Sequence, residues 1–349
     1  MAEKVTIADV ARLAGVSRQT VSNALNSPDV VREETRQRVL RAVEELGYRV
    51  NQAARQMRTG RSRLIAIRIE PDRDGINGSV LDRFLHGLTE SAARSGYRVL
   101  LYTADDDRAE VDTFEDLLGA YEPDAFVLTS THHGDLRTAW LQDHKVPFVT
   151  FGRPWSADSP EHLWVDVDGA AGTAAATRHL LDAGHRAIGF LGWPSGSGVG
   201  DDRREGWART LTAAGVDPTG LSRATSDEVA DGEKAAYDLL RSDLGVTALV
   251  CASDSLALGA LHAARSPGLA WRPGRGPGGG AAERPVAVIG FDDTPVAKAV
   301  GLTSLSQPLA QAAAHCVALL TTLLDGQADP GEPPANVLLE PSLVVRQSA

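Results

Sequence analysis

Cysteine and long apolar runs are both scarce in this chain. Cys251 and Cys316 are the only cysteines among 349 residues, which excludes a disulfide framework and a cysteine-rich metal site and suits a reducing cytoplasm. The first ten residues, MAEKVTIADV, contain no apolar core of a signal peptide, and no run reaches the length that crosses a membrane. We therefore expect a cytoplasmic protein that makes no contact with a membrane.

The sequence also lacks the short motifs of common catalytic sites. It contains no GxSxG, Walker loop or HExxH pattern. Asp292 and Asp293 are adjacent carboxylates, but neighbouring residues at a strand end point apart and form no acid–base couple. His132 and His133 are adjacent without further ligands at metal-site spacing, so a solvated loop explains them better than a metal. We expect neither an enzyme nor a bound cofactor.

Charge is distributed unevenly along the chain. The net charge is −11 at pH 7, from 35 Lys or Arg and 46 Asp or Glu residues. Residues 1–63 hold 12 of the basic and 7 of the acidic residues, a net of +5, which leaves −16 for residues 64–349. Phosphates attract the first region and repel the second, so this balance suits a protein that meets DNA with one end. The length allows two or three domains, each with its own core.

The segment from Thr6 to Asn26 predicts two short helices joined by a tight turn. Thr6 begins the first helix, and Asp9 stands three residues later, close to a capping box. Gly15 follows the last apolar position of that helix, where a left-handed cap is needed. Ser17 then caps the second helix. A third helix is expected over residues 33–46.

Three polar side chains of the second predicted helix lie off its apolar face. They are Arg18, Gln19 and Asn23. Arg suits guanine O6 and N7, and Gln or Asn suits adenine N6 and N7 in the major groove. The pattern therefore predicts a helix-turn-helix that reads DNA, and the alternative is an ordinary three-helix bundle with a polar face.

Beyond residue 63, strand-like apolar segments alternate with helical segments. LIAIRI at residues 64–69 is the first of a series that includes AFVLTS, VPFVTF, AIGFLG, ALVCAS and VAVIGF. This alternation predicts parallel sheets with helices on both faces. The units exceed one six-stranded sheet, so we expect two similar lobes with a ligand between them, at the carboxyl ends of the strands. No internal sequence repeat is evident.

Several motifs follow one another in a distinctive order. Residues 5–62 contain TIADVARLAGVSRQTVSNALN, TRQRVLRAVEELGY and NQAARQMRTGRS, and the body contains HLLDAGHRAIGFLG, ASDSLALGAL, VIGFDD and LTSLSQP. In order and spacing they resemble the LacI/GalR family of sugar-responsive transcriptional repressors. The resemblance implies an all-α helix-turn-helix head and a two-lobed α/β core like that of periplasmic binding proteins. It also implies a homodimer, with a tetramer as a further possibility, on a near-palindromic double-stranded DNA operator.

The resemblance assigns DNA contacts to the head. Residues that match Arg18, Gln19 and Asn23 read bases in the family. Those that match a second polar set hold phosphates: Thr6, Ser17, Thr20, Ser22 and Asn26.

The segment of residues 51–59 matches a hinge helix that forms on DNA and enters the minor groove beside the dimer mate. Met57 stands where the family has a Leu that wedges between base pairs. A plain flexible linker is the alternative for the free protein, since the segment is too short to be a stable helix alone. The expected DNA contacts of this segment are Asn51, Ala54, Arg55, Met57 and Arg58.

The same resemblance assigns effector contacts at strand ends of the body. Arg203 and Asp292 match family residues that grip effector hydroxyls, and an Arg fork and a carboxylate each make two directed hydrogen bonds. A structural Arg203–Asp292 ion pair in the cleft is the alternative. The further effector positions are Glu70, Asp227 and Ser253.

Tryptophan supplies the apolar half of the expected sugar site. Trp193 follows a predicted strand end, so it is either a ring that stacks on a sugar or a loop anchor. Trp155 is the second stacking candidate, and Trp207 belongs to a helix and its core. An acidic pocket disfavours phosphorylated ligands, so we expect a neutral sugar or oligosaccharide.

These observations divide the chain into three parts. We expect a DNA-binding domain over residues 1–50, a hinge helix or linker over 51–62, and an effector-binding and dimerisation domain over 63–349. In the last, the N-lobe takes about 63–163 plus 309–327, and the C-lobe about 164–307 plus 328–349. The Gly- and Pro-rich run 265–285 is expected to be a surface insertion, and VLLEPSLVVRQSA to close a sheet before a loose end.

The prediction is a repressor whose operator affinity depends on a small carbohydrate between two lobes. The ligand favours one lobe arrangement, which separates the paired hinges. Three alternatives remain: a sugar-binding receptor without a DNA role, a ligand-activated activator, and an enzyme that uses the strand-end carboxylates. The basic head and the missing signal peptide disfavour the receptor, and the sequence offers no catalytic set.

Overall fold

The computed structural model describes residues 5–26, 28–48, 56, 60–69, 76, 78–155, 162–265, 285–326 and 335–349. The chain divides into two compact units, Met1–Ser62 and Arg63–Ala349. We call the first unit the head and the second unit the body, and each is described by itself. No helix among these described residues is long and apolar enough to span a bilayer.

The described residues of the head include three α-helices and a short 3-10 helix. In chain order they are α1 (Ile7–Ala14), α2 (Arg18–Asn26), η1 (Pro28–Val30) and α3 (Glu33–Leu46). The Asp9 carboxylate accepts hydrogen bonds from the Thr6 backbone N at 3.0 Å and hydroxyl at 2.7 Å, so the predicted pairing at the start of α1 is confirmed. Gly15 ends α1 with φ of 63°. A small core joins the three helices: Val10, Ala14, Val21, Ala24, Val39 and Ala42.

The first lobe of the body is built on a six-stranded sheet whose neighbouring strands are all parallel. In spatial order the strands are β11 (Val337–Leu339), β5 (Trp164–Val167), β4 (Phe148–Phe151), β3 (Ala125–Leu128), β1 (Leu64–Arg68) and β2 (Arg98–Tyr102). The helices of this lobe are α5 (Gly78–Arg94), α6 (Asp107–Ala120), α7 (Leu136–Asp143) and α13 (Leu309–Asp325).

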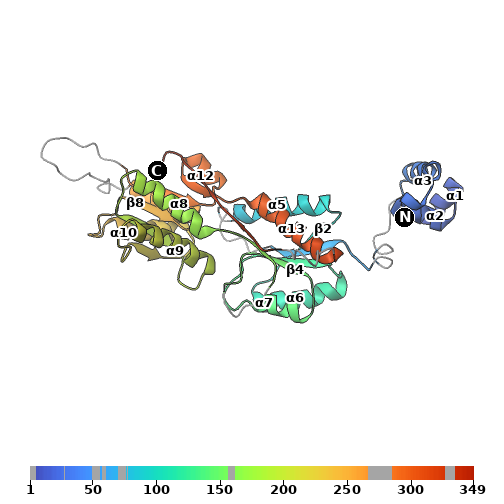
Figure 1. Ribbon diagram of the computed structural model, residues 1–349, viewed down its shortest axis with the longest axis horizontal. Helices are drawn as coiled ribbons and strands as arrows, with labels where there is room; N and C mark the ends of the chain where they lie inside the picture. The colour runs from blue at the N-terminus through green and yellow to red at the C-terminus, as the bar shows by residue number, and fades with distance from the viewer. Residues whose placement is uncertain are drawn as a thin grey trace. The chain divides into compact units, whose positions relative to one another are not determined.

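Helices cover both faces of the first sheet. Figure 1 shows α5 and α13 on one side of it and α6 and α7 on the other. Ile65 and Ile67 of β1 pack into the core cluster that contains α5 and α13, whereas Ala66 packs with Phe114 of α6. Successive strand residues point to opposite faces, so a short apolar run fills two cores at once.

The second lobe has its own six-stranded sheet. In spatial order its strands are β12 (Ser342–Val344), β10 (Thr303–Ser306), β9 (Ala287–Phe291), β8 (Ala248–Cys251), β6 (Ile188–Gly192) and β7 (Ser222–Ala224). Only β12 among these strands runs antiparallel to its neighbour. The helices are α8 (Gly169–Asp182), α9 (Gly198–Ala213), α10 (Val229–Leu240), α11 (Asp254–Ala264) and α12 (Pro295–Val300).

The two lobes repeat one topology. Without its C-terminal strand, the first sheet has the order β5-β4-β3-β1-β2 and the second has β10-β9-β8-β6-β7. The expectation of two similar lobes is therefore confirmed, although the sequence shows no repeat. Strand–helix alternation with buried apolar strands is enough to specify this fold, and matching residues are not required.

The expected boundary between the lobes is wrong for two strands. β5 pairs with β4 through Phe151 and Val165, and β11 pairs with β5 through Val337 and Val165, so residues 164–167 and 337–339 belong to the first lobe. The chain therefore crosses between lobes after β5, after β10 and between β11 and β12. An apolar run predicts a strand but does not specify which sheet the strand joins, because that depends on pairing with distant residues.

The end of the chain is held in the second lobe. The backbone N of Val288 donates to the Ser348 carbonyl at 2.8 Å, and the Ser348 hydroxyl accepts from the backbone N of Thr303 at 2.8 Å. The expectation of a loose end is therefore wrong. Most of the expected 265–285 insertion lies outside the described residues.

Candidate functional site

The head presents a polar surface at the first turns of α2. Arg18 and Gln19 are exposed, and Asn23 is half-buried. Gln19 Nε2 donates to Asn23 Oδ1 at 2.9 Å, so the two amides share one helix face. Ser17 Oγ accepts from the backbone N of Thr20 at 3.1 Å and fixes the start of the helix. Gln19 and Asn23 thus share one face of α2, and Arg18 is exposed in its first turn, the end that a helix-turn-helix inserts into the major groove.

Some of the other residues predicted to contact DNA are hydrogen-bonded or partly buried, and the rest are not described. Thr6 is bonded to Asp9 and Ser22 is half-buried. The side chain of Asn26 is not described. The hinge positions also lie outside the described residues, so their contacts stay predictions: Asn51, Ala54, Arg55, Met57 and Arg58.

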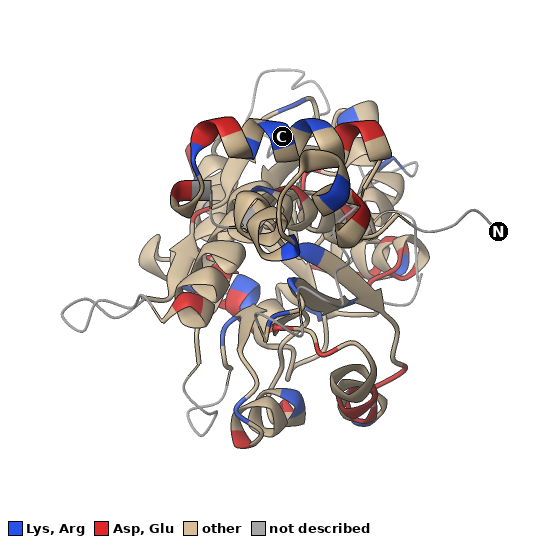
Figure 2. Ribbon diagram, turned by 90° about the vertical axis from the view of Figure 1, so that its right-hand side faces the viewer, with Lys and Arg blue, Asp and Glu red and all other residues tan. Residues whose placement is uncertain are grey.

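Basic and acidic residues both occur along the helices (Figure 2). The excess differs by region: residues 1–63 carry +5 and residues 64–349 carry −16. A basic excess attracts the phosphate backbone whatever the base sequence, and base contacts add specificity.

A cleft of about 1680 Å³ lies between the two lobes of the body. Its walls include Arg68 and Thr129 from the first lobe and Trp193, Arg203 and Asp227 from the second. Arg68 ends β1, Thr129 follows β3 and Trp193 follows β6, so the cleft opens at the carboxyl ends of the parallel strands. This is the edge where the sequence predicted a ligand.

Arg203 of α9 is the central cation of the second-lobe wall. Its Nη1 donates to the Ala252 carbonyl at 2.5 Å, and its Cζ lies 3.6 Å from the ring centroid of Phe291. Burial lowers the pKa of Arg203, although nearby carboxylates such as Asp292 and Asp227 oppose this. Its buried Nε has no hydrogen-bond partner among the described residues. A desolvated guanidinium with open donors is suited to bind ligand oxygens.

Asp292 follows β9 and faces the same cleft. Its backbone has φ of 114°, in the left-handed region that non-glycine residues rarely adopt. Its Oδ1 accepts from Gln307 Nε2 at 2.6 Å, and its carbonyl accepts from Arg83 Nη1 at 3.2 Å. Burial raises the pKa of Asp292 to about 8, although Arg203 opposes the shift. The alternative of a direct Arg203–Asp292 ion pair is not realised between these two described side chains.

The remaining effector candidates play different parts. Asp227 lines the cleft and accepts a hydrogen bond from the Ser253 hydroxyl. Ser253 also caps α11 by accepting from the backbone N of Leu256 at 3.2 Å, and it is not among the described residues that line the cleft. Ser253 therefore orients Asp227. Glu70 lies outside the described residues.

The side chains of Trp155, Trp193 and Trp207 all contact other groups of the protein. Trp193 packs against the second-lobe core with Arg203 Cζ 5.4 Å from its ring centroid, and its buried Nε1 has no partner among the described residues. Trp155 lies over Arg153, whose Cζ is 4.7 Å from the ring centroid. Trp207 is buried and donates Nε1 to the Ile188 carbonyl at 3.2 Å, which confirms its expected place in the core.

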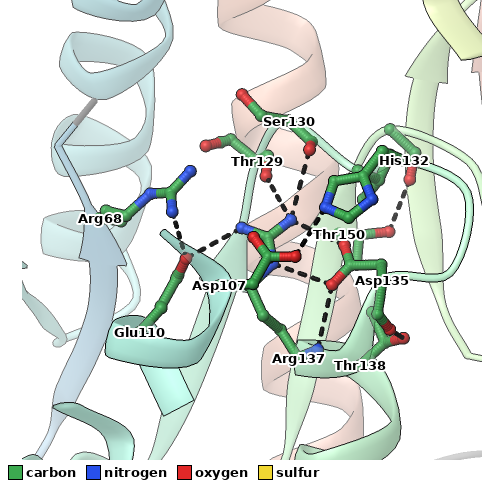
Figure 3. A network of polar contacts seen from close by, with 12 residues as sticks. Arg68, Asp107, Glu110, Thr129, Ser130, His132, Asp135, Arg137, Thr138 and Thr150 are labelled. Carbon is green, nitrogen blue, oxygen red and sulfur yellow. Dashed lines mark hydrogen bonds and ion pairs between the residues drawn. The ribbon is translucent and has the colours of Figure 1, made fainter. Parts of the chain in front are cut away.

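Sequence reasoning missed a buried ion network in the first-lobe wall. Arg137 donates to Asp135 Oδ1 at 2.9 Å, to Glu110 Oε2 at 3.0 Å and to the Thr129 carbonyl at 3.1 Å (Figure 3). Arg68 Nη1 lies 2.6 Å from the same Glu110 oxygen. The network fixes the loop after β3 that lines the cleft. Its members come from different elements, and no sequence pattern connects them.

Asp107, His132 and Asp135 lie close enough together to suggest a metal, with ligand atoms within 4.8 Å of one another. His132 Nε2 is 2.7 Å from Asp107 Oδ2, and Arg137 occupies both oxygens of Asp135 (Figure 3). Burial opposes protonation of His132, but the His133 carbonyl and Asp107 outweigh it and raise its pKa. Arg137 already occupies Asp135, and His132 bonds Asp107 while its side chain stays 41% exposed, so this loop is both hydrogen-bonded and solvated.

Comparison with known proteins agrees with this geometry. The model for bacterial regulatory proteins of the lacI family matches residues 6–51, and the model for the periplasmic binding protein-like domain matches residues 177–349. The HTH-type transcriptional regulator CelR of Thermobifida fusca is 32% identical over 98% of this chain and 98% of its own. The regulator AglR of Rhizobium meliloti is 32% identical over 99% of this chain and 94% of its own.

Two solved structures extend the comparison to the fold. The complex of the transcriptional regulator CelR with cellobiose has a TM-score of 0.70 at 28% identity and covers 99% of this chain and 100% of its own. The lac repressor dimer bound to operator and the anti-inducer ONPF has a TM-score of 0.79 at 26% identity and covers 99% of both chains. Head and body together define a DNA-binding transcriptional regulator with a periplasmic-binding-protein-like ligand domain. The chain belongs to the LacI family, and the resemblance seen in the sequence is confirmed.

Proposed function

We propose that the chain is a homodimeric cytoplasmic repressor that releases a near-palindromic operator when a neutral sugar or oligosaccharide binds between its lobes. The observation that carries this proposal is the strand-end cleft in which Arg203 faces Asp227 and Asp292, with a buried Nε that no described residue accepts from. Paired donors and acceptors of this kind suit adjacent hydroxyl groups. The cellobiose bound to CelR is a relative's ligand of this class.

Arg18, Gln19 and Asn23 read bases in this proposal. Arg18 and Gln19 begin α2 and Asn23 follows one turn later, and DNA replaces the Gln19–Asn23 hydrogen bond with bonds to base edges. Two copies of the head contact two half-sites of the operator, and the hinge segments pair between them. The effector acts by favouring a lobe arrangement that separates the hinges.

Fluorescence anisotropy of labelled DNA from upstream of the chain's own gene tests the whole proposal. The full-length protein is titrated onto the DNA with and without a panel of glucose, galactose, maltose, cellobiose and glucose 6-phosphate. We expect operator binding that one neutral sugar weakens and that the phosphorylated sugar leaves unchanged. A sugar that tightens DNA binding would indicate an activator or a corepressed regulator, and sugar binding without DNA binding would indicate a receptor.

A base-reading test addresses the head alone. Arg18→Ala is expected to relax preference at one operator position by about 1–3 kcal/mol, because a bidentate guanine contact is lost. Binding of randomised operators, followed by sequencing, measures this preference. Arg38→Ala removes an exposed arginine from α3 and serves as the matched control. An unaltered preference in Arg18→Ala would refute the assignment of base-reading residues.

A further inference from the structure

Arg153 joins the two lobes of the body through one guanidinium group. It follows β4 and belongs to the first lobe. Its Nε donates to Asp166 Oδ2 at 2.7 Å in β5 of the same lobe, and its Nη2 donates to Asp202 Oδ2 at 2.9 Å in α9 of the second lobe. Both carboxylates line the cleft, whereas Arg153 is not among the described residues that line it.

Each side of this cross-lobe bond is held in place. The Arg153 carbonyl accepts from Thr131 Oγ1 at 3.0 Å, and the Trp155 ring covers the guanidinium and donates Nε1 to the same Thr131 oxygen at 3.2 Å. In the second lobe, Asp202 Oδ2 also accepts from the backbone N of Ala170 at 3.0 Å. A relative movement of the lobes therefore breaks the Arg153–Asp202 bond and leaves the contacts inside each lobe intact.

The start of α9 is shaped to receive this contact. Gly198 lies against the Trp155 ring, and a Cβ at Gly198 would stand 2.2 Å from Trp155 Cγ. Only a residue without a side chain allows the ring of the first lobe to approach the helix of the second lobe so closely.

The cross-lobe bond is also coupled to the candidate effector contact. Asp202 and Arg203 are consecutive in α9, and a Cβ on Gly169 would stand 2.9 Å from both Asp202 Oδ2 and Arg203 Cγ. A ligand that hydrogen-bonds to Arg203 therefore acts on the same turn of α9 that Arg153 contacts through Asp202. Arg83 makes a second cross-lobe bond, to the Asp292 carbonyl at 3.2 Å, so loss of Arg153 alone weakens the contact between the lobes without abolishing it.

We propose that Arg153 is a positioning residue of the cleft. Its bond to Asp202 favours the lobe arrangement in which Arg203 and the first-lobe wall face one ligand, and so raises effector affinity without touching the effector. The affinity part rests on the proposed function. Arginine is required because its planar fork presents donors to two carboxylates at once, whereas lysine offers a single ammonium group. An effector then binds a favoured arrangement instead of creating it.

The lobe arrangement is tested without any effector. Glu115→Cys in α6 and Asp238→Cys in α10 are exposed attachment sites for a donor and acceptor dye, and the native Cys251 and Cys316 are buried and do not compete for labelling. The labelled full chain is assembled with an excess of unlabelled chain, so that one labelled copy is present per assembly. We expect single-molecule energy transfer to shift to a second distribution in Arg153→Met. The control Arg209→Met removes an exposed i,i+4 pair with Glu205 on α9 and leaves the distribution unchanged.

Effector affinity is the second measurement, by calorimetry with cellobiose and then with the other sugars of the panel. We expect Arg153→Met to weaken binding about tenfold, within the usual range of coupling between sites. Arg153→Lys restores part of this loss, and Arg209→Met binds normally. Asp202→Ala removes the acceptor of the same bond in the second lobe and replaces Arg153→Met in the energy-transfer experiment if that variant does not fold.

The outcomes separate the two proposals. If no sugar binds the wild type, the proposed function fails, while the energy-transfer distributions still decide the role of Arg153. An Arg153→Met distribution that superimposes on the wild type overturns the positioning role. A shifted distribution with unchanged affinity for a bound sugar also overturns it, because the bond would then not favour the binding arrangement.

Discussion

The two lobes share a topology but differ in how completely their buried arginines are hydrogen-bonded. In the first lobe, Arg137 is 1% exposed and donates to Asp135, Glu110 and two loop carbonyls (Figure 3). In the second lobe, Arg203 is 7% exposed and leaves its Nε without a partner among the described residues. The Arg137 guanidinium is thus hydrogen-bonded entirely by groups of the first lobe.

This difference assigns separate tasks to the two walls. The Arg137 network fixes its loop and has little to gain from a ligand, since each nitrogen of the Arg137 guanidinium already has an acceptor. An arginine that is desolvated and incompletely paired gains most when a ligand supplies oxygens. We infer that the first lobe shapes the cleft and that the second lobe supplies most of the effector's binding energy.

Removal of Arg137 tests the structural side of this comparison and has the largest expected effect. Arg137→Met leaves Glu110 and Asp135 buried with less compensation, and breaking a buried ion pair costs about 3–5 kcal/mol. We expect the free energy of unfolding to fall by that amount in urea titrations. Arg94→Met removes an exposed pair with Glu90 and serves as the control with no measurable change. Equal stabilities of the two variants would mean that the network does not support the first lobe.

Removal of Arg203 tests the ligand side. Arg203→Met is expected to weaken effector binding about 100-fold, because a charged hydrogen-bonding partner of the ligand is lost, while operator affinity is retained. Its stability is expected to fall by less than that of Arg137→Met, since Arg203 donates to the Ala252 carbonyl whereas Arg137 donates to two buried carboxylates. Anisotropy with the active sugar measures the response. Normal induction in this variant would place the ligand elsewhere.

The sequence predicted the elements of the fold better than their assignment to lobes. Capping residues, apolar spacing and strand–helix alternation act locally, so the head helices and the body strands are readable from neighbouring residues. β5 and β11 were assigned to the wrong lobe because a strand's sheet depends on pairing partners far along the chain. Long-range pairing is the information that a single sequence lacks.

In the cleft too, the sequence predicted individual residues but not the contacts between distant parts of the chain. The family resemblance implied Arg203 and Asp292 as cleft residues and Asp227 was expected in a nearby loop, and all three line the cleft. The sequence did not predict that Ser253 bonds Asp227, because that contact joins two loops in space. The bridge from Arg153 to Asp202 was missed for the same reason, as its donor and acceptor belong to different lobes.

Asp292 predicts a pH dependence of stability. Burial raises its pKa from an ordinary 3.8 to about 8, so between these values the folded chain holds a proton that the unfolded chain has released. Stability therefore falls as pH rises through this window, by at most about 1.4 kcal/mol per pH unit. Asp292→Asn removes this dependence. Unfolding measured from pH 5 to pH 8 should show the wild type losing stability relative to the variant, and parallel curves would show that Asp292 ionises normally.

The smallest expected effect compares the indole N–H groups of two tryptophans in the second lobe. Trp207 Nε1 donates to the Ile188 carbonyl at 3.2 Å, whereas Trp193 Nε1 is buried without a partner among the described residues. Replacement by Phe removes the N–H from either site. We expect Trp207→Phe to cost about 1 kcal/mol more than Trp193→Phe, because only the first change breaks a hydrogen bond. Thermal unfolding without effector measures this difference.

With the active sugar present the order should reverse if the ligand supplies the missing acceptor, since Trp193→Phe then loses ligand-induced stabilisation that Trp207→Phe keeps. An unchanged order in both conditions would show that Trp193 is a packing residue only, and among the described residues of the second-lobe wall Arg203 would then be the one buried open donor.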